Sequence, residues 1–304
     1  MDTSKLAGHI SCFSAYLIFG VNIVICKDIS GSTFISPLEL FTLRAIGASI
    51  LFWLASVILP GPRAEKMAVS DLPRVFVASM LGLFLTQVSF LFACKCTTPV
   101  DISLMGTLSP IATMFIAAVA LKEPITSKKA LGVAISFIGV ICLILNSTHA
   151  ASSIDHTTPA GWALMFVNMF SFALYLGIFR PLIRKYSAIT FMKWMFLFSA
   201  IVSLPFTARG LLTEVPYSQI PTIYYLELSY LIVMATFVAY FLVPVGQKRL
   251  RPTVVSLYNY LQPIIAIAIA ISVGMDSMSW PKALAAAAVV GGAVLVNFSR
   301  AASH

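Results

Sequence analysis

Charged side chains are scarce in this 304-residue chain: they make up 10% of it, whereas 59% of its residues are hydrophobic and the mean hydropathy is +0.94. Because soluble domains carry about 25% charged residues, this chain lacks the polar side chains needed to cover a water-facing globule. The net charge of +9 comes from lysines and arginines in short segments between apolar runs. The composition therefore predicts a membrane protein with several spans and no nucleic-acid partner.

Residues for catalysis, redox chemistry and metal binding are also few. The cysteines include no CxxC pair, and the Cys-Lys-Cys at 94–96 has too short a gap for a redox motif or a complete metal site. The four histidines lie at a helix end, in one loop and at the C-terminus, and no phosphate-binding P-loop occurs. We therefore expect neither an enzyme nor an ATP-driven pump, and no metal or cofactor.

Apolar runs dominate what is present, and each is about as long as the 20 residues that a bilayer core requires. Pro, Gly and charge clusters divide the chain into ten predicted transmembrane helices. Ser36-Pro37-Leu38-Glu39 and Thr98-Pro99-Val100-Asp101 are capping-box patterns that mark helix starts. The ten predicted helices span 8–26, 37–59, 72–94, 99–121, 128–146, 159–180, 189–208, 222–245, 252–273 and 281–298.

The distribution of Lys and Arg predicts the orientation of these helices. If the N-terminus is cytoplasmic, the inside segments contain fourteen basic residues and the outside segments contain four. The outside four are Lys27, Lys95, Arg209 and Lys282, while Arg44 and Lys193 lie within helices. The bias places both termini in the cytoplasm, and we expect a multi-pass protein of the cytoplasmic (inner) membrane.

The chain repeats itself at an offset of 153 residues. Between residues 95–139 and 248–292, fourteen of 45 aligned positions are identical without a gap. We assign residues 1–148 to a first five-helix repeat and residues 149–304 to a second. Because five is odd, the second repeat crosses the membrane in the opposite sense, and inverted repeats are typical of secondary transporters.

Several motifs resemble the drug/metabolite transporter superfamily, and its EamA-type members in particular. They are the Phe-Gly-Val-Asn at 19–22, Arg44, the Leu-Ser-Pro at 108–110 followed by 121–126, and the Thr-Phe-Val-Ala-Tyr at 236–240. This chain departs from the family pattern in having Phe19 in place of a tryptophan and Asp276 in place of a glutamate. The resemblance implies ten helices around a central cavity lined by helices 1, 3, 4, 6, 8 and 9.

Polar and aromatic side chains recur at equivalent depths in the two repeats. Asn22 corresponds to Tyr175, Gln87 to Tyr240, and Thr107 to Tyr260. An uncharged, aromatic-lined pocket suits a small zwitterion or a planar ring, although each residue alone is also consistent with a hydrogen bond between helices. The predicted substrate-binding residues are Asn22, Arg44, Gln87, Ser103, Thr107, Tyr175, Tyr240, Ser256, Asn259 and Tyr260.

Charged residues and prolines within the helices add further candidates. Arg44 suits a carboxylate or phosphate, or pairs with a loop acid or reaches the headgroups. Glu227 is a candidate for proton coupling, or a solvated acid at the interface. Pro110 and Pro263 are candidate hinges or fixed kinks.

The acids Glu123 and Asp276 occupy the same position in the two repeats, each just past an apolar run. We expect both to cap the helix that follows; an ion-pair gate is the alternative.

These features favour a secondary active or facilitative transporter that exports or exchanges small metabolites, amino acids or related zwitterionic or aromatic compounds, by alternating access. The alternatives are a nucleotide-sugar, sugar-phosphate or lipid-linked metabolite carrier of the same fold and, less favoured, a membrane-embedded enzyme. The expected partners are a small-molecule substrate and membrane lipids, and no obligatory protein partner is inferred.

Overall fold

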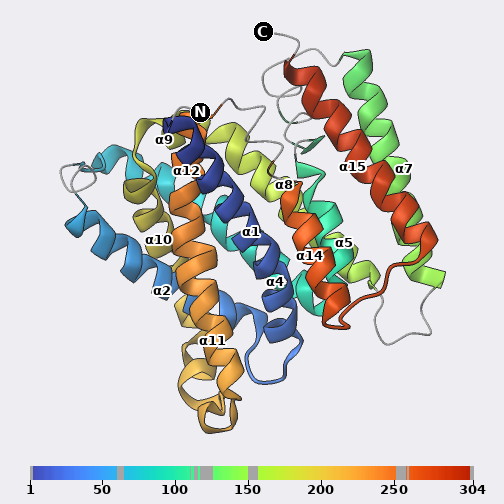
Figure 1. The fold of residues 1–304 in the computed structure, drawn as a ribbon. Helices are drawn as coiled ribbons and strands as arrows, with labels where there is room; N and C mark the ends of the chain where they lie inside the picture. The colour runs from blue at the N-terminus through green and yellow to red at the C-terminus, as the bar shows by residue number, and fades with distance from the viewer. Residues whose placement is uncertain are drawn as a thin grey trace.

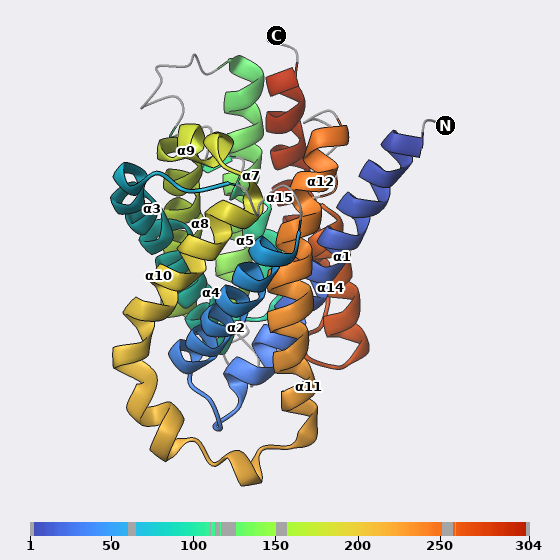
Figure 2. The ribbon, with the colours of Figure 1, turned by 90° about the vertical axis from the view of Figure 1, so that its left-hand side faces the viewer.

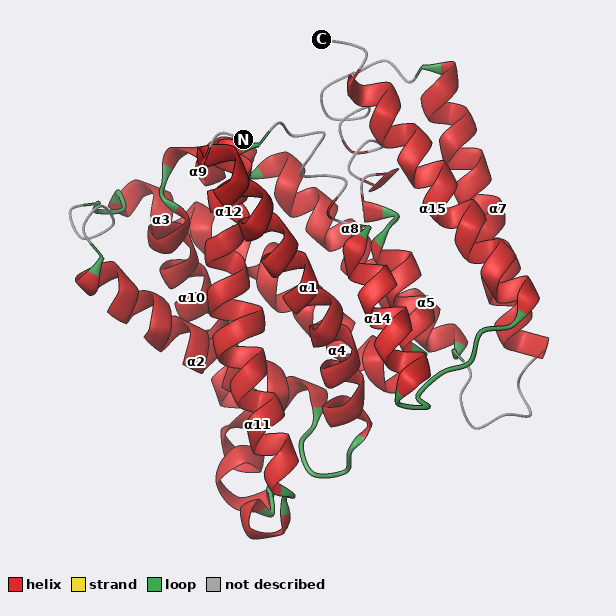
Figure 3. Cartoon of the chain, viewed as in Figure 1, coloured by secondary structure: helices red, strands yellow, loops and turns green. Residues whose placement is uncertain are grey.

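Helices make up nearly all of the described structure, a computed structural model of the chain (Figure 1). Within the described residues there is no strand (Figure 3). The structure describes residues 3–59, 65–109, 111–112, 116, 126–149, 157–250, 258 and 260–301.

The elements follow the predicted order. The first part contains α1 (Thr3–Gly31), α2 (Pro37–Ile58), η2 (Val69–Asp71), α3 (Leu72–Ser79), η3 (Met80–Leu85), α4 (Thr86–Cys96), α5 (Pro99–Gly106) and α7 (Ser127–His149). The second part contains α8 (Pro159–Ile178), α9 (Arg180–Lys185), α10 (Ala188–Arg209), η4 (Gly210–Glu214), η5 (Tyr217–Gln219), α11 (Thr222–Tyr230), η6 (Leu231–Val238), α12 (Ala239–Arg249), α14 (Leu261–Ser272) and α15 (Trp280–Ala301).

Seven helical stretches in the described chain are long and apolar enough to cross a bilayer, and Leu261–Ser272 and Trp280–Val296 are shorter apolar helices. Many large apolar side chains face outward, including Ile58, Phe206 and Leu212. Such a surface is stable in lipid and would be unfavourable in water. The chain is therefore a multi-pass membrane protein, while the count of ten helices and the position of the termini stay predictions.

Contacts between helices show a symmetry between the two parts of the chain. The most extensive contacts join α7 to α15, α2 to α10, α1 to α12 and α14, and α4 to α8. Exchanging each helix for its counterpart in the other repeat turns α1–α12 into α8–α4, and leaves α2–α10 and α7–α15 unchanged. Figures 1 and 2 both show α7 and α15 side by side. This is the pattern that two repeats related by a pseudo-two-fold axis would produce.

Two side-chain contacts join positions 153 residues apart. Ser136 Oγ donates to Val289 O at 3.1 Å, and Gln87 Nε2 donates to the Tyr240 hydroxyl at 3.4 Å. Equivalent positions can touch each other only close to the axis that relates them. The repeat boundary at residues 148/149 itself stays a prediction.

Small residues allow α7 and α15 to approach closely. A Cβ on Gly292 would lie 2.4 Å from the Gly132 carbonyl oxygen, and one on Gly139 would lie 2.8 Å from the Ala285 carbonyl oxygen. Small residues at a helix interface in lipid permit this backbone approach. The two contacts are equivalent at the repeat offset, since Gly132 corresponds to Ala285 and Gly139 to Gly292.

Both predicted segments that contain a hinge proline are interrupted. We predicted continuous helices over 99–121 and 252–273. Instead, α5 ends at Gly106 and is followed by a turn at 107–108, and Tyr260 lies in a turn immediately before α14. Thr107 and Tyr260 are equivalent at the repeat offset. A proline ring clashes with the carbonyl four residues earlier in a continuous helix, which explains why α14 restarts just before Pro263.

The third and eighth predicted helices each contain a π-helical stretch, η3 and η6. At each stretch a threonine hydroxyl donates to the carbonyl five residues earlier, at 2.7 Å: Thr86, directly after η3, to Leu81, and Thr236, within η6, to Leu231. Neither stretch was expected from the sequence. π-Bulges within α-helices are frequent at functional sites.

Local helix signals are mostly confirmed. The Ser36–Glu39 capping box forms with both of its hydrogen bonds. Thr98 caps α5 by accepting from Asp101 N, but the Asp101 carboxylate does not return to Thr98 N and instead accepts from Thr157. Asp28 lies beyond the predicted end of the first helix at residue 26 but within the last turns of α1, because that helix continues to Gly31.

Candidate functional site

Arg44 lies inside the helix bundle on α2, with 6% of the residue exposed. Its Nη1 donates to Cys26 Sγ of α1 at 3.5 Å, and its Nη2 donates to Thr236 Oγ1 of η6 at 3.2 Å. Among the described residues no carboxylate forms an ion pair with it. The guanidinium is therefore held in place by neutral groups, and the headgroup-reaching position that we considered for it is not observed.

A small cavity of about 10 Å³ adjoins this guanidinium. Its volume suffices for about one water molecule. The lining residues come from α2, α4, α10, η6 and α12, and they are Phe41, Arg44, Ala45, Gln87, Phe196, Thr236 and Tyr240. Arg44, Gln87 and Tyr240 were all predicted from the sequence, and the structure brings them together.

Aromatic rings enclose this cavity. Tyr240 makes edge contacts with Phe19 at 5.9 Å and with Phe196 at 6.0 Å between ring centroids. The Tyr240 hydroxyl accepts the hydrogen bond from Gln87 described above. The site therefore combines one cation, one amide and two hydroxyl groups with apolar ring surfaces.

Asn22 is connected to the site through one intermediate residue. Its Oδ1 accepts from Cys26 Sγ at 3.6 Å, one helical turn along α1, and the same sulfur accepts from Arg44. Asn22 thus orients Cys26, which in turn holds the guanidinium. Sequence reasoning identified Asn22 but assigned no role to Cys26.

Other predicted site residues do not line the cavity. The Tyr175 hydroxyl donates to Met195 Sδ at 3.7 Å, and its ring packs on Gly82, where a Cβ would lie 2.5 Å from it. Ser103 and Thr107 donate to carbonyls of their own helix at 2.8 and 2.7 Å. Tyr260 is half-buried at the start of α14. Ser256, Asn259 and Pro110 lie outside the described residues.

Three residues that line the cavity were not predicted from the sequence: Thr236, Phe41 and Phe196. Thr236 was quoted only as part of a motif, yet it is buried and contacts Arg44 from a position 192 residues away. The aromatic residues are indistinguishable by sequence from the other phenylalanines of an apolar helix. A signal for Thr236 did exist, because a threonine four residues before Tyr240 lies on the same side of a helix.

Comparison with known proteins identifies the fold and the family. The model of the EamA-like transporter family matches residues 6–145 and again residues 159–298. The chain belongs to this family.

Three relatives of this EamA-family chain are named as uncharacterized transporters. An uncharacterized transporter of Archaeoglobus fulgidus is 28% identical over 173 residues, which is 57% of this chain and 58% of that protein. The uncharacterized transporter YyaM of Bacillus subtilis is 26% identical over 69% of this chain and 67% of its own length. YetK, also an uncharacterized transporter of Bacillus subtilis, is 23% identical over 95% and 86%.

A solved crystal structure resembles this family member over 100% of both chains, with a TM-score of 0.63 and 18% sequence identity. At that identity the likeness concerns the fold alone. The fold and the transporter family are therefore established, while the transported compound is not specified by any of these relatives.

A second buried cation of this EamA-family protein lies where α5 meets α15. Lys282 Nζ bonds Asp276 Oδ1 at 2.8 Å and lies 4.0 Å from Asp101 Oδ1. The other Asp276 oxygen accepts from Val100 N at 3.2 Å. We expected Asp276 to cap the helix after it, but it caps α5 instead, because its loop lies against the start of that helix. Glu123, its counterpart, lies outside the described residues.

Glu227 is placed on α11, away from the Arg44 cavity. It is half-buried, its Oε2 atom has no hydrogen-bond partner within the part of the chain that the structure describes, and the Asp28 carboxyl of α1 lies beside it. It precedes Thr236 by nine residues, a rise of about 13 Å along a helix. Its predicted role in proton coupling would thus act at a distance from the cavity.

Proposed function

We propose that this EamA-family transporter exports or exchanges small metabolites that carry a carboxylate, amino acids or related zwitterionic and aromatic compounds, and that Arg44 binds the carboxylate. The observation that carries this proposal is a buried guanidinium whose hydrogen-bond partners in the described chain are all neutral, next to a cavity.

The charge on Arg44 is the first step of the argument. Arginine keeps its proton in proteins, so burial leaves a full positive charge in a medium of low polarity. Such a charge is costly unless it is paired and hydrogen-bonded. Cys26 and Thr236 supply hydrogen bonds but no negative charge, and a substrate carboxylate would supply it in the forked geometry that guanidinium prefers.

The other lining residues favour a small organic anion over a phosphate ester. Gln87 and Tyr240 offer neutral polar groups, and Phe41 and Phe196 offer apolar rings. Ligand sites that bury most of their ligand are lined mainly by apolar and aromatic groups with few polar ones. A sugar-phosphate or nucleotide carrier would need further cations, and Arg44 is the one cation among the described lining residues.

The small size of the cavity supports alternating access. A space of about 10 Å³ holds no amino acid, so the site must open before substrate enters. The interrupted helices at Thr107 and Tyr260 and the π-helical η3 and η6 are irregular backbone at corresponding positions of the two repeats. Broken helices at repeat-related positions support rocking of one repeat against the other, with Pro110 and Pro263 as the proposed hinges.

Glu227 and Asp28 are the proposed coupling pair. Two carboxyl groups side by side cannot both ionise easily, so the pair tends to hold one proton. If that proton is coupled to transport, Glu227→Gln should remove the pH dependence of substrate uptake and leave counterflow intact. Unchanged pH dependence in this variant would exclude the pair from coupling.

Counterflow tests the proposal without knowledge of the driving force. Proteoliposomes preloaded with an unlabelled L-amino-acid mixture should transiently accumulate the labelled mixture, and those containing Arg44→Gln should not. Arg44→Lys, which keeps the charge but not the fork, should retain a fraction of the activity. Accumulation of sugar phosphates in place of amino acids would support the alternative carrier, and equal amino-acid counterflow in Arg44→Gln would remove Arg44 from the site.

A further inference from the structure

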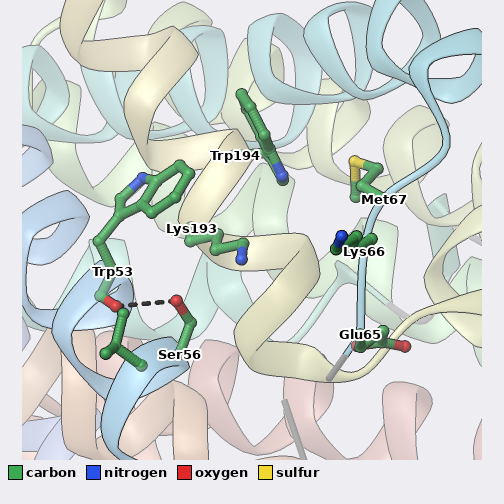
Figure 4. A pocket seen from close by; sticks show the side chains of 8 residues that line it. Trp53, Ser56, Glu65, Lys66, Met67, Lys193 and Trp194 are labelled. Carbon is green, nitrogen blue, oxygen red and sulfur yellow. Dashed lines mark hydrogen bonds between the residues drawn. The ribbon is translucent and has the colours of Figure 1, made fainter. Parts of the chain in front are cut away.

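A larger pocket lies at the other end of α2 from its capping box, away from the Arg44 cavity. Its volume is about 440 Å³, within the range of pockets that hold small molecules. It is formed by the last turns of α2, the segment at 65–67 and the first turns of α10 (Figure 4). The lining residues are Trp53, Ser56, Val57, Glu65, Lys66, Met67, Lys193 and Trp194.

Lys193 places a positive charge in this pocket, and the Glu65 carboxylate that also lines the pocket balances that charge only in part. The residue is 9% exposed, and its Nζ lies 4.7 Å from the centroid of the Trp53 ring. Within the described chain its ammonium makes neither a hydrogen bond nor an ion pair. A cation over an indole face gains about 0.5–2 kcal/mol, which does not replace an anionic partner for a buried charge.

Two further donors face the same space. Figure 4 shows the Lys66 side chain across from Lys193, and the indole nitrogen of Trp194 directed between them. Trp53 and Trp194 pack edge to face with ring centroids 5.3 Å apart, so the two rings form a wall. The pocket therefore presents two ammonium groups and one N–H to any ligand lying against this wall.

Glu65 also lines the pocket, but its carboxylate is hydrogen-bonded to Ser187. It accepts from Ser187 N at 3.0 and 3.1 Å and from Ser187 Oγ, at the N-terminus of α10. Burial raises the pKa of Glu65, but hydrogen bonds from Ser187 and Thr190 and the charge of Lys193 outweigh it, so the pKa lies below its usual value. Its charge is thus stabilised at the α10 N-terminus, and Figure 4 shows Glu65 below Lys66 at the edge of the pocket.

The rim of the pocket is apolar surface that lipid would cover. Val57 is 60% exposed and Ile58, the last residue of α2, is 72% exposed. Tryptophan and lysine near helix ends are typical of the headgroup level of a membrane. The Lys and Arg distribution predicts that this end of α2 faces the cytoplasm, where anionic lipids attract basic groups.

We propose that this pocket binds a phosphate group, with Lys193 and Lys66 as its cationic partners and Trp194 as a donor, and that the phosphate belongs to an anionic phospholipid headgroup. The site is separate from the proposed transport site: Phe52, which precedes Trp53, is fully buried and stacks on Phe196 at 5.6 Å between centroids. The proposal therefore stands whichever compound is transported.

Tryptophan quenching by brominated lipids tests this proposal. The full chain carrying Trp280→Phe, which removes a lipid-exposed indole, is reconstituted with brominated phosphatidylglycerol or brominated phosphatidylcholine at equal mole fractions. We expect the apparent affinity for the anionic lipid to exceed that for the zwitterionic lipid, and Lys193→Met to lower this preference about fivefold, the effect of one basic residue near a membrane surface.

Matched variants separate the pocket from general charge effects. Lys193→Arg should keep the preference, and Lys95→Met, which removes an exposed lysine elsewhere, should leave it unchanged. A further arm titrates inorganic phosphate into protein in purely zwitterionic vesicles. A fluorescence response there that Lys193→Met abolishes, without any lipid preference, would support a phosphate site filled from solution and overturn the lipid source.

Two results would overturn the proposal as a whole. One is an equal anionic-lipid preference in wild type and Lys193→Met, with both proteins monodisperse. The other is no response to either anionic lipid or phosphate in the wild type.

Discussion

Arg44 and Lys282 are two buried cations whose surroundings differ in one respect. Each residue is less than a tenth exposed, at 6% and 8%. Lys282 has Asp276 at 2.8 Å and Asp101 at 4.0 Å, whereas Arg44 bonds a thiol and a hydroxyl beside a cavity. A charge balanced within the protein stabilises the scaffold, and a charge left unbalanced beside a cavity is positioned for a ligand.

The largest expected effect is a loss of stability when the ion pair between Lys282 and Asp276 is broken. Lys282→Met leaves two buried carboxylates without their cation, and removing one partner of a buried ion pair costs about 3–5 kcal/mol. We expect a clearly lower melting temperature in detergent, with partial recovery when Asp276→Asn is added. A single variant that melts like the wild type would mean that the network does not hold α5 and α15 together.

Arg44→Gln, in contrast to Lys282→Met, should change stability little and substrate affinity strongly. Because the substitution leaves no carboxylate unpaired among the partners of Arg44, we expect a free energy of unfolding within about 1 kcal/mol of the wild type. The substrate, however, loses a charge-assisted hydrogen bond of about 1.5–3 kcal/mol, which lowers its affinity in counterflow more than tenfold. Melting and counterflow are measured on the same preparation. A stability loss as large as that of Lys282→Met would assign Arg44 to the scaffold.

Tyr240→Phe tests how much the Tyr240 hydroxyl contributes to substrate affinity at the Arg44 site. It removes the hydroxyl bonded to Gln87 but keeps the ring between Phe19 and Phe196. We expect an affinity loss of about 1 kcal/mol, or fivefold. Tyr258→Phe removes a hydroxyl bonded to His9, outside the cavity, and should leave affinity unchanged; equal losses would indicate a general effect of tyrosine hydroxyls.

The smallest effect concerns a charge at the surface, Glu65. Since its pKa is lowered, its contribution is present above the ordinary glutamate pKa of about 4.3 and is lost as pH falls through its folded value. The melting-temperature advantage of wild type over Glu65→Gln should therefore be constant near neutral pH and shrink below about pH 4. A gap that widens on acidification would contradict this assignment.

Residues close together in the sequence were predicted well. The Ser36–Glu39 capping box and the Thr98 cap of α5 formed as expected, because each depends on groups three residues apart. The repeat offset identified Gln87 and Tyr240 as equivalent positions, but the hydrogen bond between them was not predicted. Asp276 was placed correctly in its loop, but its partner Val100 lies 176 residues away, so local signals could not identify it.

The sequence by itself determined that this chain spans a membrane, that it is a helical duplication and that it resembles transporters, since hydropathy, caps and repeat identities are properties of contiguous residues. Only the tertiary structure decided which cation is balanced and which is not. Arg44 could have met an acid from any helix, and packing against α1 and η6 gave it Cys26 and Thr236. Charge balance in a bilayer depends on which distant helices become neighbours, and no single segment contains that information.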